Sequence, residues 1–397
     1  MVLKIRPKSI LMFAFLASLF FNALVWSKII DANTISSVYL FMLLPIVTGF
    51  LILTIELVRG TLRLLYFREM LIGVGLFALF IGVSLVKIRQ TGRFTIGTFG
   101  EATRMVAPFI YVFLAVNILS HEDIDRIMIT TLYVAWVAYI INQFIITGDS
   151  HLGTSISIID SSSPFENSEV AAIAFAIACY YIYFRKRHSA CCFWSVLLTM
   201  ACFKRVYMLF VIILLVCSGN LNSGNLNKEQ KVNKFIRWPL LLVSSLLFVA
   251  ATSFYLYTME PQNLAWTFEK LHFDVNTFSM YRSYRVQYLI QHNYVSYGLS
   301  SSTSFLATNP GSWFRQSTLE LDLIKILIEL GKWPLMIFIL AYYSLSYKSA
   351  YGYLTITAFM LNLLMASGLT EYYAWFVMLV TLAMIRYNTS VDMHDTY

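Results

Sequence analysis

Two arginines in the C-terminal third of the chain have the spacing of an anion-binding pair. Arg282 and Arg285 are three residues apart in a segment of helical character, so both side chains project from one helix face. Paired guanidinium groups match the oxygens of a phosphate through two parallel hydrogen bonds. The alternative is that both arginines are solvated on an interfacial helix that touches lipid headgroups.

Three more basic residues have the same chemical capacity. Lys204 and Arg205 follow Phe203 in a very short turn between two apolar segments, where a basic pair can grip a phosphate. The alternative for this pair is a simple solvated turn. Arg104 lies three residues after Glu101 within another apolar segment, and these two side chains can instead neutralise each other at the membrane interface.

Carboxylates follow the arginines at the start of an apolar helical run. Glu320 and Asp322 stand at a predicted membrane boundary. A charged side chain is costly there unless it has a functional role. There are structural alternatives for both residues. Ser317 and Glu320 have the spacing of a capping box, and Asp322 in the first helical turn suits the helix dipole.

The same run contains two further charged residues and a predicted end. Lys325 and Glu329 are four residues apart, so we expect them to form a local ion pair with no further role. Gly331 is expected to end the helix, and a new helix is expected to start at Trp333 and Pro334.

The composition indicates that these residues sit in a helical membrane protein. The 397 residues are 58% hydrophobic and 13% charged, against about 25% charged in soluble domains. The apolar residues form blocks, and roughly 20 of them are needed for one crossing. We therefore predict an all-α integral membrane protein, a single multi-pass domain over 1–397, with about twelve transmembrane helices. The predicted spans are 9–26, 37–54, 70–86, 98–118, 127–147, 168–184, 189–203, 206–218, 238–257, 333–347, 350–367 and 371–386.

The net charge of +8 is better explained by membrane topology than by nucleic acid, because no nucleic-acid-binding pattern accompanies it. With the N-terminus in the cytoplasm, most Lys and Arg residues fall in cytoplasmic loops, and the external loop 148–167 has neither. Both termini are then cytoplasmic. The candidate anion-binding residues lie on the opposite side, against the general trend, which is the reason to consider a role for them.

Two long connections differ in character. The segment 219–237 contains a short tandem repeat and mixed charges, and we expect a flexible cytoplasmic loop. The segment 258–332 has no full span but is rich in Trp, Phe and Tyr, which argues against disorder. We expect it to be one large external loop that carries short helices packed on the membrane surface over a cavity.

The sequence contains no recognisable metal-binding or cofactor-binding pattern. The five cysteines lie in or beside apolar runs without a Cys-x-x-Cys spacing, so we interpret them as packing residues. The histidines are scattered, and no Asp-x-Asp motif lies in the predicted external loops. We therefore predict no metal and no cofactor.

Several of these motifs resemble those of the bacterial Wzy-type polymerases of O-antigen and capsule repeat units. Arg282, its helix and the following Gly298 resemble the arginine–helix–glycine segment of that family. The run from Glu320 to Gly331 resembles the family's acidic segment, and 164–168 and 203–205 resemble two of its shorter loops. The resemblance covers the whole topology and is most specific in the large loop.

The resemblance implies glycosyl transfer at the periplasmic face of the bacterial inner membrane, between two oligosaccharides linked to undecaprenyl diphosphate. It implies that the diphosphate is bound by basic residues, namely Arg282, Arg205, Arg285, Arg104 and Lys204. It implies a carboxylate that orients or deprotonates the acceptor hydroxyl, namely Asp322, Glu320 or Glu166. Membrane lipid, a chain-length regulator and a flippase are the further partners expected, and nucleic acid is not.

Two other functions remain as alternatives. The related O-antigen ligases carry a His-Asn pair before the glycine-ended helix, where this chain has Glu320 and Asp322; its own His292 and Asn293 come earlier, before Gly298. A repeat-unit flippase is compatible with many spans. However, flippases and other transporters usually show internal repeats and charges within spans, and the two halves of this chain show no convincing similarity.

Overall fold

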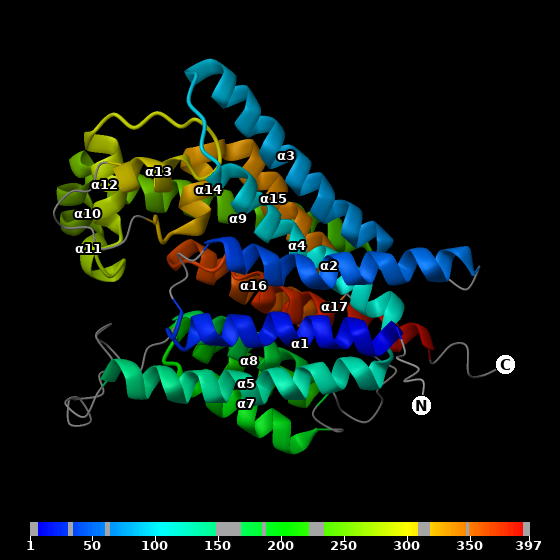
Figure 1. Ribbon diagram of the computed structural model, residues 1–397. Coiled ribbons are helices and arrows are strands. Elements are labelled where there is room, and N and C mark those ends of the chain that lie inside the picture. The colour runs from blue at the N-terminus through cyan, green and yellow to red at the C-terminus, as the bar shows by residue number, and fades with distance from the viewer. Residues whose placement is uncertain are drawn as a thin grey trace. The chain divides into compact units, whose positions relative to one another are not determined.

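The computed structural model describes residues 7–30, 35–59, 64–147, 168–184, 188–221, 234–308, 318–346 and 349–391, which fold into helices without a β-strand (Figure 1). The long apolar helices are α1 (Pro7–Trp26), α2 (Ile35–Val58), α3 (Phe67–Thr91), α4 (Gly97–Ile118), α5 (His121–Thr147), α6 (Ser168–Tyr183), α7 (Ser189–Ala201), α8 (Arg205–Leu221), α9 (Lys234–Met259), α15 (Lys332–Ser346), α16 (Ala350–Met365) and α17 (Tyr372–Val391). The short elements are η2 (Pro261–Asn263), α10 (Leu264–Leu271), α11 (Val275–Phe278), α12 (Ser283–Gln291), α13 (Ser301–Thr308) and α14 (Asp322–Leu330).

Every apolar segment predicted as a span coincides with one of the long helices. Within the described ranges, six helices are long and apolar enough to cross a membrane: α1 to α5 and α9. The other long helices do not meet this criterion, which α17 meets in composition only over the shorter stretch Tyr372–Arg386, so a total of twelve crossings stays a prediction. Large apolar side chains point outward from the long helices, as Leu51 (62% exposed) and Leu247 (65% exposed) do. Such faces are costly in water, which agrees with a helical membrane protein.

The chain divides into two compact units, and two of the four boundaries fall within α3 and α4. The first unit contains Met1–Leu71, Ala107–Glu229 and Glu371–Tyr397, and the second contains Ile72–Val106 and Gln230–Thr370. The expectation of one multi-pass domain stays a prediction.

In the first unit, α6 is the central helix and packs against α5, α7, α8 and α17. Its side chains from Val170 to Ile182 are buried, and many are alanines that allow close helix approach. Polar groups in this unit pair with one another: Arg386 bonds Glu69, and Asp125 accepts a hydrogen bond from Tyr180. Asp125 also lies 3.5 Å from a ring nitrogen of His188.

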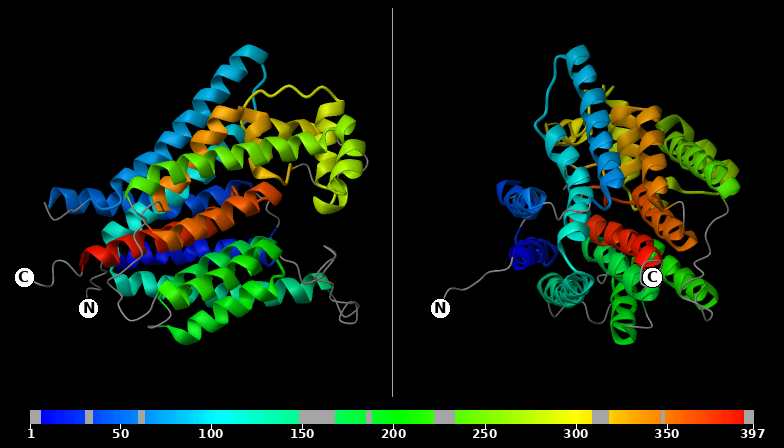
Figure 2. Two further views of the ribbon diagram at one scale, coloured as in Figure 1. Left: turned by 180° about the vertical axis from the view of Figure 1, so that it is seen from behind. Right: turned by 90° about the vertical axis from the view of Figure 1, so that its right-hand side faces the viewer.

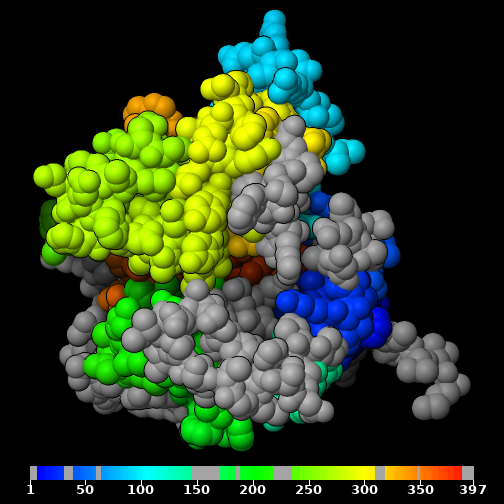
Figure 3. Space-filling view, turned by 90° about the vertical axis from the view of Figure 1, so that its left-hand side faces the viewer, coloured from blue at the N-terminus to red at the C-terminus, as the bar shows by residue number. Residues whose placement is uncertain are grey.

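In the second unit, α9 lies beside α15, and α14 packs against α9, α15 and α16 (Figure 2). The short helices α10, α11 and α12 gather at the C-terminal end of α9 and form one continuous surface (Figures 1 and 3). They share an apolar core with α13 and α14, in which Val286, Leu289 and Ile324 are almost fully buried. This arrangement confirms the prediction that 258–332 carries short helices; its periplasmic location stays a prediction.

Local sequence explains how the short helices begin. Asp274 caps α11, because its carboxylate accepts hydrogen bonds from the backbone N–H groups of Asn276 and Thr277. The side-chain oxygen of Asn276 in turn accepts bonds from Ser283 and Gln287, which ties α11 to α12. Most of the predicted flexible loop 219–237 lies outside the described residues, and α9 begins at its end, with Lys234.

Candidate functional site

Arg282 and Arg285 converge on one carboxylate in the second unit. The Nε of Arg282 donates a hydrogen bond of 2.9 Å to Oε2 of Glu320, and the guanidinium of Arg285 lies 3.3 Å from Oε1. The three side chains are between 14% and 21% exposed, so solvent and ligands can reach them. The guanidinium groups also donate to the backbone carbonyls of Met365 (3.4 Å) and Thr318 (3.0 Å). We call Arg282, Arg285 and Glu320 the arginine cluster.

A strained turn positions the arginine cluster. Met280 and Tyr281 have φ angles of +54° and +62°, in the left-handed region that bulky residues rarely adopt. The turn is held by a backbone hydrogen bond of 2.8 Å from Tyr281 N–H to the Asn276 carbonyl. Residues held in such conformations cost about 1–3 kcal/mol each and concentrate at functional sites. The turn places Arg282 at the N-cap of α12, one residue before the helix.

The capping-box alternative for Glu320 is wrong. Helix α14 begins at Asp322, so Glu320 precedes the helix and its side chain is bound to the two arginines. Ser317 lies outside the described residues. Gly331 ends α14 as predicted, with a φ of +102° that favours glycine, and α15 follows at once from Lys332.

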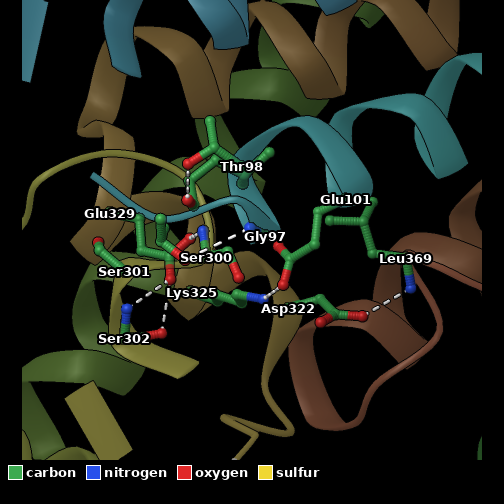
Figure 4. Close-up of polar contacts among 12 residues, drawn as sticks. Gly97, Thr98, Glu101, Ser300, Ser301, Ser302, Asp322, Lys325, Glu329 and Leu369 are labelled. Atoms are coloured by element: carbon green, nitrogen blue, oxygen red, sulfur yellow. Dashed lines mark hydrogen bonds and ion pairs between the residues drawn. The ribbon is translucent and has the colours of Figure 1, made fainter. Parts of the chain in front are cut away.

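Asp322 binds backbone rather than solvent. One carboxylate oxygen accepts hydrogen bonds of 2.7 Å and 2.6 Å from the N–H groups of Gly368 and Leu369, in the turn after α16 (Figure 4). The side chain is buried. The carbonyl of Met365, which Arg282 contacts, lies at the end of the same helix. Asp322 therefore fixes the turn that stands beside the arginine cluster.

Lys325 and Glu329 do not form the simple local pair that their spacing predicts. The Nζ of Lys325 donates to Oε1 of Glu101 on α4, so the cation reaches a residue far away in the sequence (Figure 4). Glu101 therefore pairs with Lys325 rather than only with its neighbour Arg104. The local pair of Glu101 with Arg104 stays a prediction beside this long-range ion pair.

Glu329 organises the segment before α13. Its carboxylate accepts hydrogen bonds from Ser300 N–H (2.8 Å), Ser302 N–H (2.9 Å) and the Ser302 hydroxyl (2.6 Å) (Figure 4). These N–H groups belong to the N-terminal end of α13, where a negative charge suits the helix dipole. Glu329 has no exposed surface. It caps α13 from a different helix.

The segment at 298–300 is fixed from α3 and α4 as well. Leu299 N–H donates to the Ser84 hydroxyl (3.0 Å), and the Thr98 hydroxyl donates to the Leu299 carbonyl (2.8 Å). Gly298 has a φ of +115°, and a Cβ there would meet the Ser84 Cβ at 2.7 Å. Only glycine fits this conformation and this close approach.

Burial and charge set the protonation of α14, which lies outside the six long apolar helices. Desolvation raises the pKa of Asp322 to about 6, against the opposing effect of Lys325 and the two backbone N–H groups. Desolvation also raises the pKa of Glu329, with Lys325 again opposing. For Lys325, desolvation lowers the pKa, but Glu101 and the other carboxylates outweigh it, so the pKa is raised and the side chain stays charged.

The other predicted site residues are distributed as follows. Lys204 and Arg205 belong to the first unit; Lys204 is buried in the turn after α7, and Arg205 is the exposed first residue of α8. Arg104 lies half-buried on α4, in the second unit. Glu166 lies outside the described residues. The arginine cluster is thus the part of the predicted site that the structure brings together.

Sequence reasoning missed the buried network of Glu101, Lys325, Asp322 and Glu329. The available signal was the presence of charged residues in apolar helical runs, because such residues need partners. Among the described residues, no group of three or more His, Cys, Asp or Glu side chains is placed to hold a metal ion.

Comparison with known proteins adds no assignment. No family model, curated protein or solved structure matched the chain.

Proposed function

We propose that this protein is a bacterial inner-membrane glycosyltransferase that polymerises oligosaccharide repeat units linked to undecaprenyl diphosphate. The observation that carries the proposal is the arginine cluster, in which two reachable guanidinium groups share one carboxylate. Two cations and one anion leave a net positive charge, which suits a diphosphate. The resemblance of the same segment to repeat-unit polymerases supports this choice among anionic ligands.

The proposed reaction joins two lipid-linked glycans at the periplasmic face. The acceptor hydroxyl of one repeat unit attacks the anomeric carbon of the growing glycan on its lipid carrier. A glycosidic bond forms, the bond between the anomeric carbon and the diphosphate oxygen breaks, and undecaprenyl diphosphate leaves. The acceptor hydroxyl loses one proton. The leaving diphosphate gains negative charge in the transition state, so fixed cations beside it lower the barrier.

Arg282 and Arg285 hold the leaving diphosphate. Each is anchored by a backbone carbonyl, at Met365 and Thr318, so both are positioned before the lipid binds. Such preorganised groups need little rearrangement during the reaction. Arg104, in the same unit, is a further candidate for contact with the lipid diphosphate, and the role of Lys204 and Arg205 stays a prediction from the sequence.

Glu320 is the carboxylate best placed to accept the proton. When phosphate oxygens bind the two guanidinium groups, they displace the Glu320 carboxylate. The Glu320 oxygens can then accept the proton of the acceptor hydroxyl. Asp322 stands two residues away, but one of its oxygens binds backbone N–H groups and the side chain is buried. It therefore acts as a positioning residue for the turn beside Arg282. Glu166 remains a further candidate base.

The test uses surface polysaccharide from a deletion strain, separated on a gel. Wild-type protein restores a ladder of chain lengths, and Arg282→Ala and Glu320→Gln are expected to leave single repeat units without a ladder. Lys270→Ala is the matched control, since Lys270 is an exposed cation on α10 of the same segment. This control is expected to restore the full ladder. Protein levels in the membrane are compared by immunoblot.

Other gel patterns decide between the alternatives. Free polymer that is not attached to the lipopolysaccharide core in the deletion strain would identify a ligase. Loss of all surface glycan would identify a flippase. A normal ladder from Arg282→Ala would refute the assignment of the arginine cluster to the diphosphate.

A further inference from the structure

Two tyrosines beside the arginine cluster stack on each other at the surface. The ring centroids of Tyr281 and Tyr284 are 5.7 Å apart, and the ring planes differ by 28°. Tyr281 is 58% exposed and Tyr284 is 42% exposed, although both rings are large and apolar. We call this pair the tyrosine platform. An exposed aromatic pair beside an anion-binding group needs a reason beyond chance.

The tyrosine platform is built by the same strained turn that positions Arg282. Tyr281 itself has a φ of +62°, and its carbonyl accepts a 3.3 Å hydrogen bond from Tyr284 N–H. The strained backbone therefore directs two neighbouring side chains at once: Arg282 toward Glu320, and Tyr281 onto the ring of Tyr284. One strained turn thus positions two adjacent groups, and residues held in such conformations cluster at ligand-binding sites.

We propose that the tyrosine platform binds a sugar ring of the lipid-linked oligosaccharide, the one next to the diphosphate. The faces of aromatic rings are electron-rich. They therefore attract the polarised C–H groups on one face of a pyranose ring, while the phenol hydroxyls can bond the sugar hydroxyls. Each tyrosine of the platform directly precedes one arginine of the cluster, at residues 281–282 and 284–285. In the ligand the first sugar is likewise bonded directly to the diphosphate.

This inference rests on the proposed function and adds a glycan subsite to it. Diphosphate binding alone does not require the rings, since a guanidinium pair suffices for an anion. An interfacial position in lipid headgroups is the competing explanation, because tyrosine is frequent at membrane interfaces. The two explanations differ in what touches the rings, which can be measured.

Binding is tested with the full-length protein in lipid nanodiscs. The probe is the oligosaccharide released by mild acid from the lipid-linked pool of the deletion strain, and contact is measured by saturation-transfer NMR. Tyr281→Ala/Tyr284→Ala is expected to weaken the signal about fivefold or more, because both ring contacts are lost. Tyr281→Phe/Tyr284→Phe keeps the rings and is expected to retain most of the signal.

Two control variants make the result specific. Phe268→Ala removes a ring that is 62% exposed on α10 and is expected to leave the signal unchanged. Tyr284→Leu keeps an apolar side chain on the helix surface while removing the ring, and it serves if the double alanine variant is unstable. Wild-type signal from Tyr281→Ala/Tyr284→Ala or from Tyr284→Leu would overturn the inference. Equal loss from Phe268→Ala would overturn it as well.

A second measurement separates sugar from lipid. The difference in fluorescence between Tyr281→Trp and the wild-type protein, which has eight tryptophans of its own, reports the surroundings of the ring. We expect this difference to respond to the oligosaccharide and not to brominated lipids. Strong quenching of this difference by brominated lipids would place the ring in the membrane and overturn the inference. If the deletion strain accumulates no lipid-linked oligosaccharide, the proposed function fails and the inference fails with it. If the pool accumulates and the tyrosine variants bind it normally, the inference alone fails.

Discussion

Replacing Lys325 by methionine tests whether the buried network stabilises the second unit. The Lys325 side chain is 5% exposed, and its Nζ bonds Glu101 on a helix far away in the sequence. Lys325→Met keeps a similar length and removes the charge. It leaves Glu101 without this partner and leaves Asp322 and Glu329 without the cation that opposes their protonation.

Lys325→Met removes one partner of a buried ion pair, and this sets the expected loss of stability. Such changes lower the free energy of unfolding by about 3–5 kcal/mol, because a buried charge loses its partner. In a chain of 397 residues the unfolding entropy is about 0.8 kcal/mol/K, so we expect the melting temperature to fall by about 4–6 °C. Lys325→Met/Glu101→Gln removes both charges and should recover about half of the loss or more, since no uncompensated charge remains at Glu101.

The assay is thermal unfolding of the purified protein in detergent, followed by circular dichroism. Lys332→Met is the matched control, because Lys332 is exposed at the start of α15, close to Lys325 in the sequence. It should change the free energy of unfolding by less than about 0.5 kcal/mol. The reasoning is refuted if Lys325→Met melts like the wild type, or if the double variant is no more stable than the single one.

Further predictions concern other parts of the second unit. Burial raises the pKa of Asp322 from 3.8 to about 6, so the folded state binds more protons than the unfolded chain between these values. The unfolding free energy should therefore fall as pH rises through this window, by about 3 kcal/mol from this residue. Asp322→Asn should flatten the slope of melting temperature against pH, and an unchanged slope would contradict the pKa. Arg282→Lys keeps the charge but loses the two-pronged geometry, so the polysaccharide ladder should be strongly reduced; a full ladder would show that charge alone suffices. Gly298→Ala should lower the melting temperature by several degrees because of the clash with Ser84 and the φ of +115°. A Cβ added at Gly75 meets nothing within 4 Å, so Gly75→Ala is the control variant for Gly298→Ala.

The sequence predicted the helices well because the signal is local. Each long apolar run became a helix, since a run of this kind in lipid must satisfy its backbone hydrogen bonds internally. Gly331 was predicted to end a helix and does so in a backbone conformation that favours glycine. The spacing of Arg282 and Arg285 likewise predicted that both side chains act together, and they share Glu320.

The partners of the charged residues were not predictable in the same way. Lys325 and Glu329 have ideal spacing for a local pair, yet Lys325 bonds Glu101 and Glu329 caps α13. Spacing along one helix defines which residues can meet, whereas tertiary packing decides which of several partners is chosen. The assignment of Glu320 to a capping box failed because the helix begins at Asp322, a boundary that sequence alone places only to within a few residues.

The stacking of the tyrosine platform was predictable only in part from the sequence. Tyr281, Tyr284 and Tyr288 are three and then four residues apart, a spacing that is typical of one helix face. Tyr281, however, lies in the strained turn before the helix, with a positive φ that its residue type gives no reason to expect. Its stacking on Tyr284 therefore depends on the backbone of the turn, which is held by the Asn276 carbonyl.

The most direct test of the central claim is polymerisation by the purified protein alone. The protein in nanodiscs is mixed with lipid-linked oligosaccharide extracted from the deletion strain, without nucleotide sugars and with a metal chelator. We expect glycans that lengthen in steps of one repeat unit, together with release of undecaprenyl diphosphate, and loss of both products with Arg282→Ala. Wild-type protein that leaves the lipid-linked oligosaccharide at its original length would refute the proposed function.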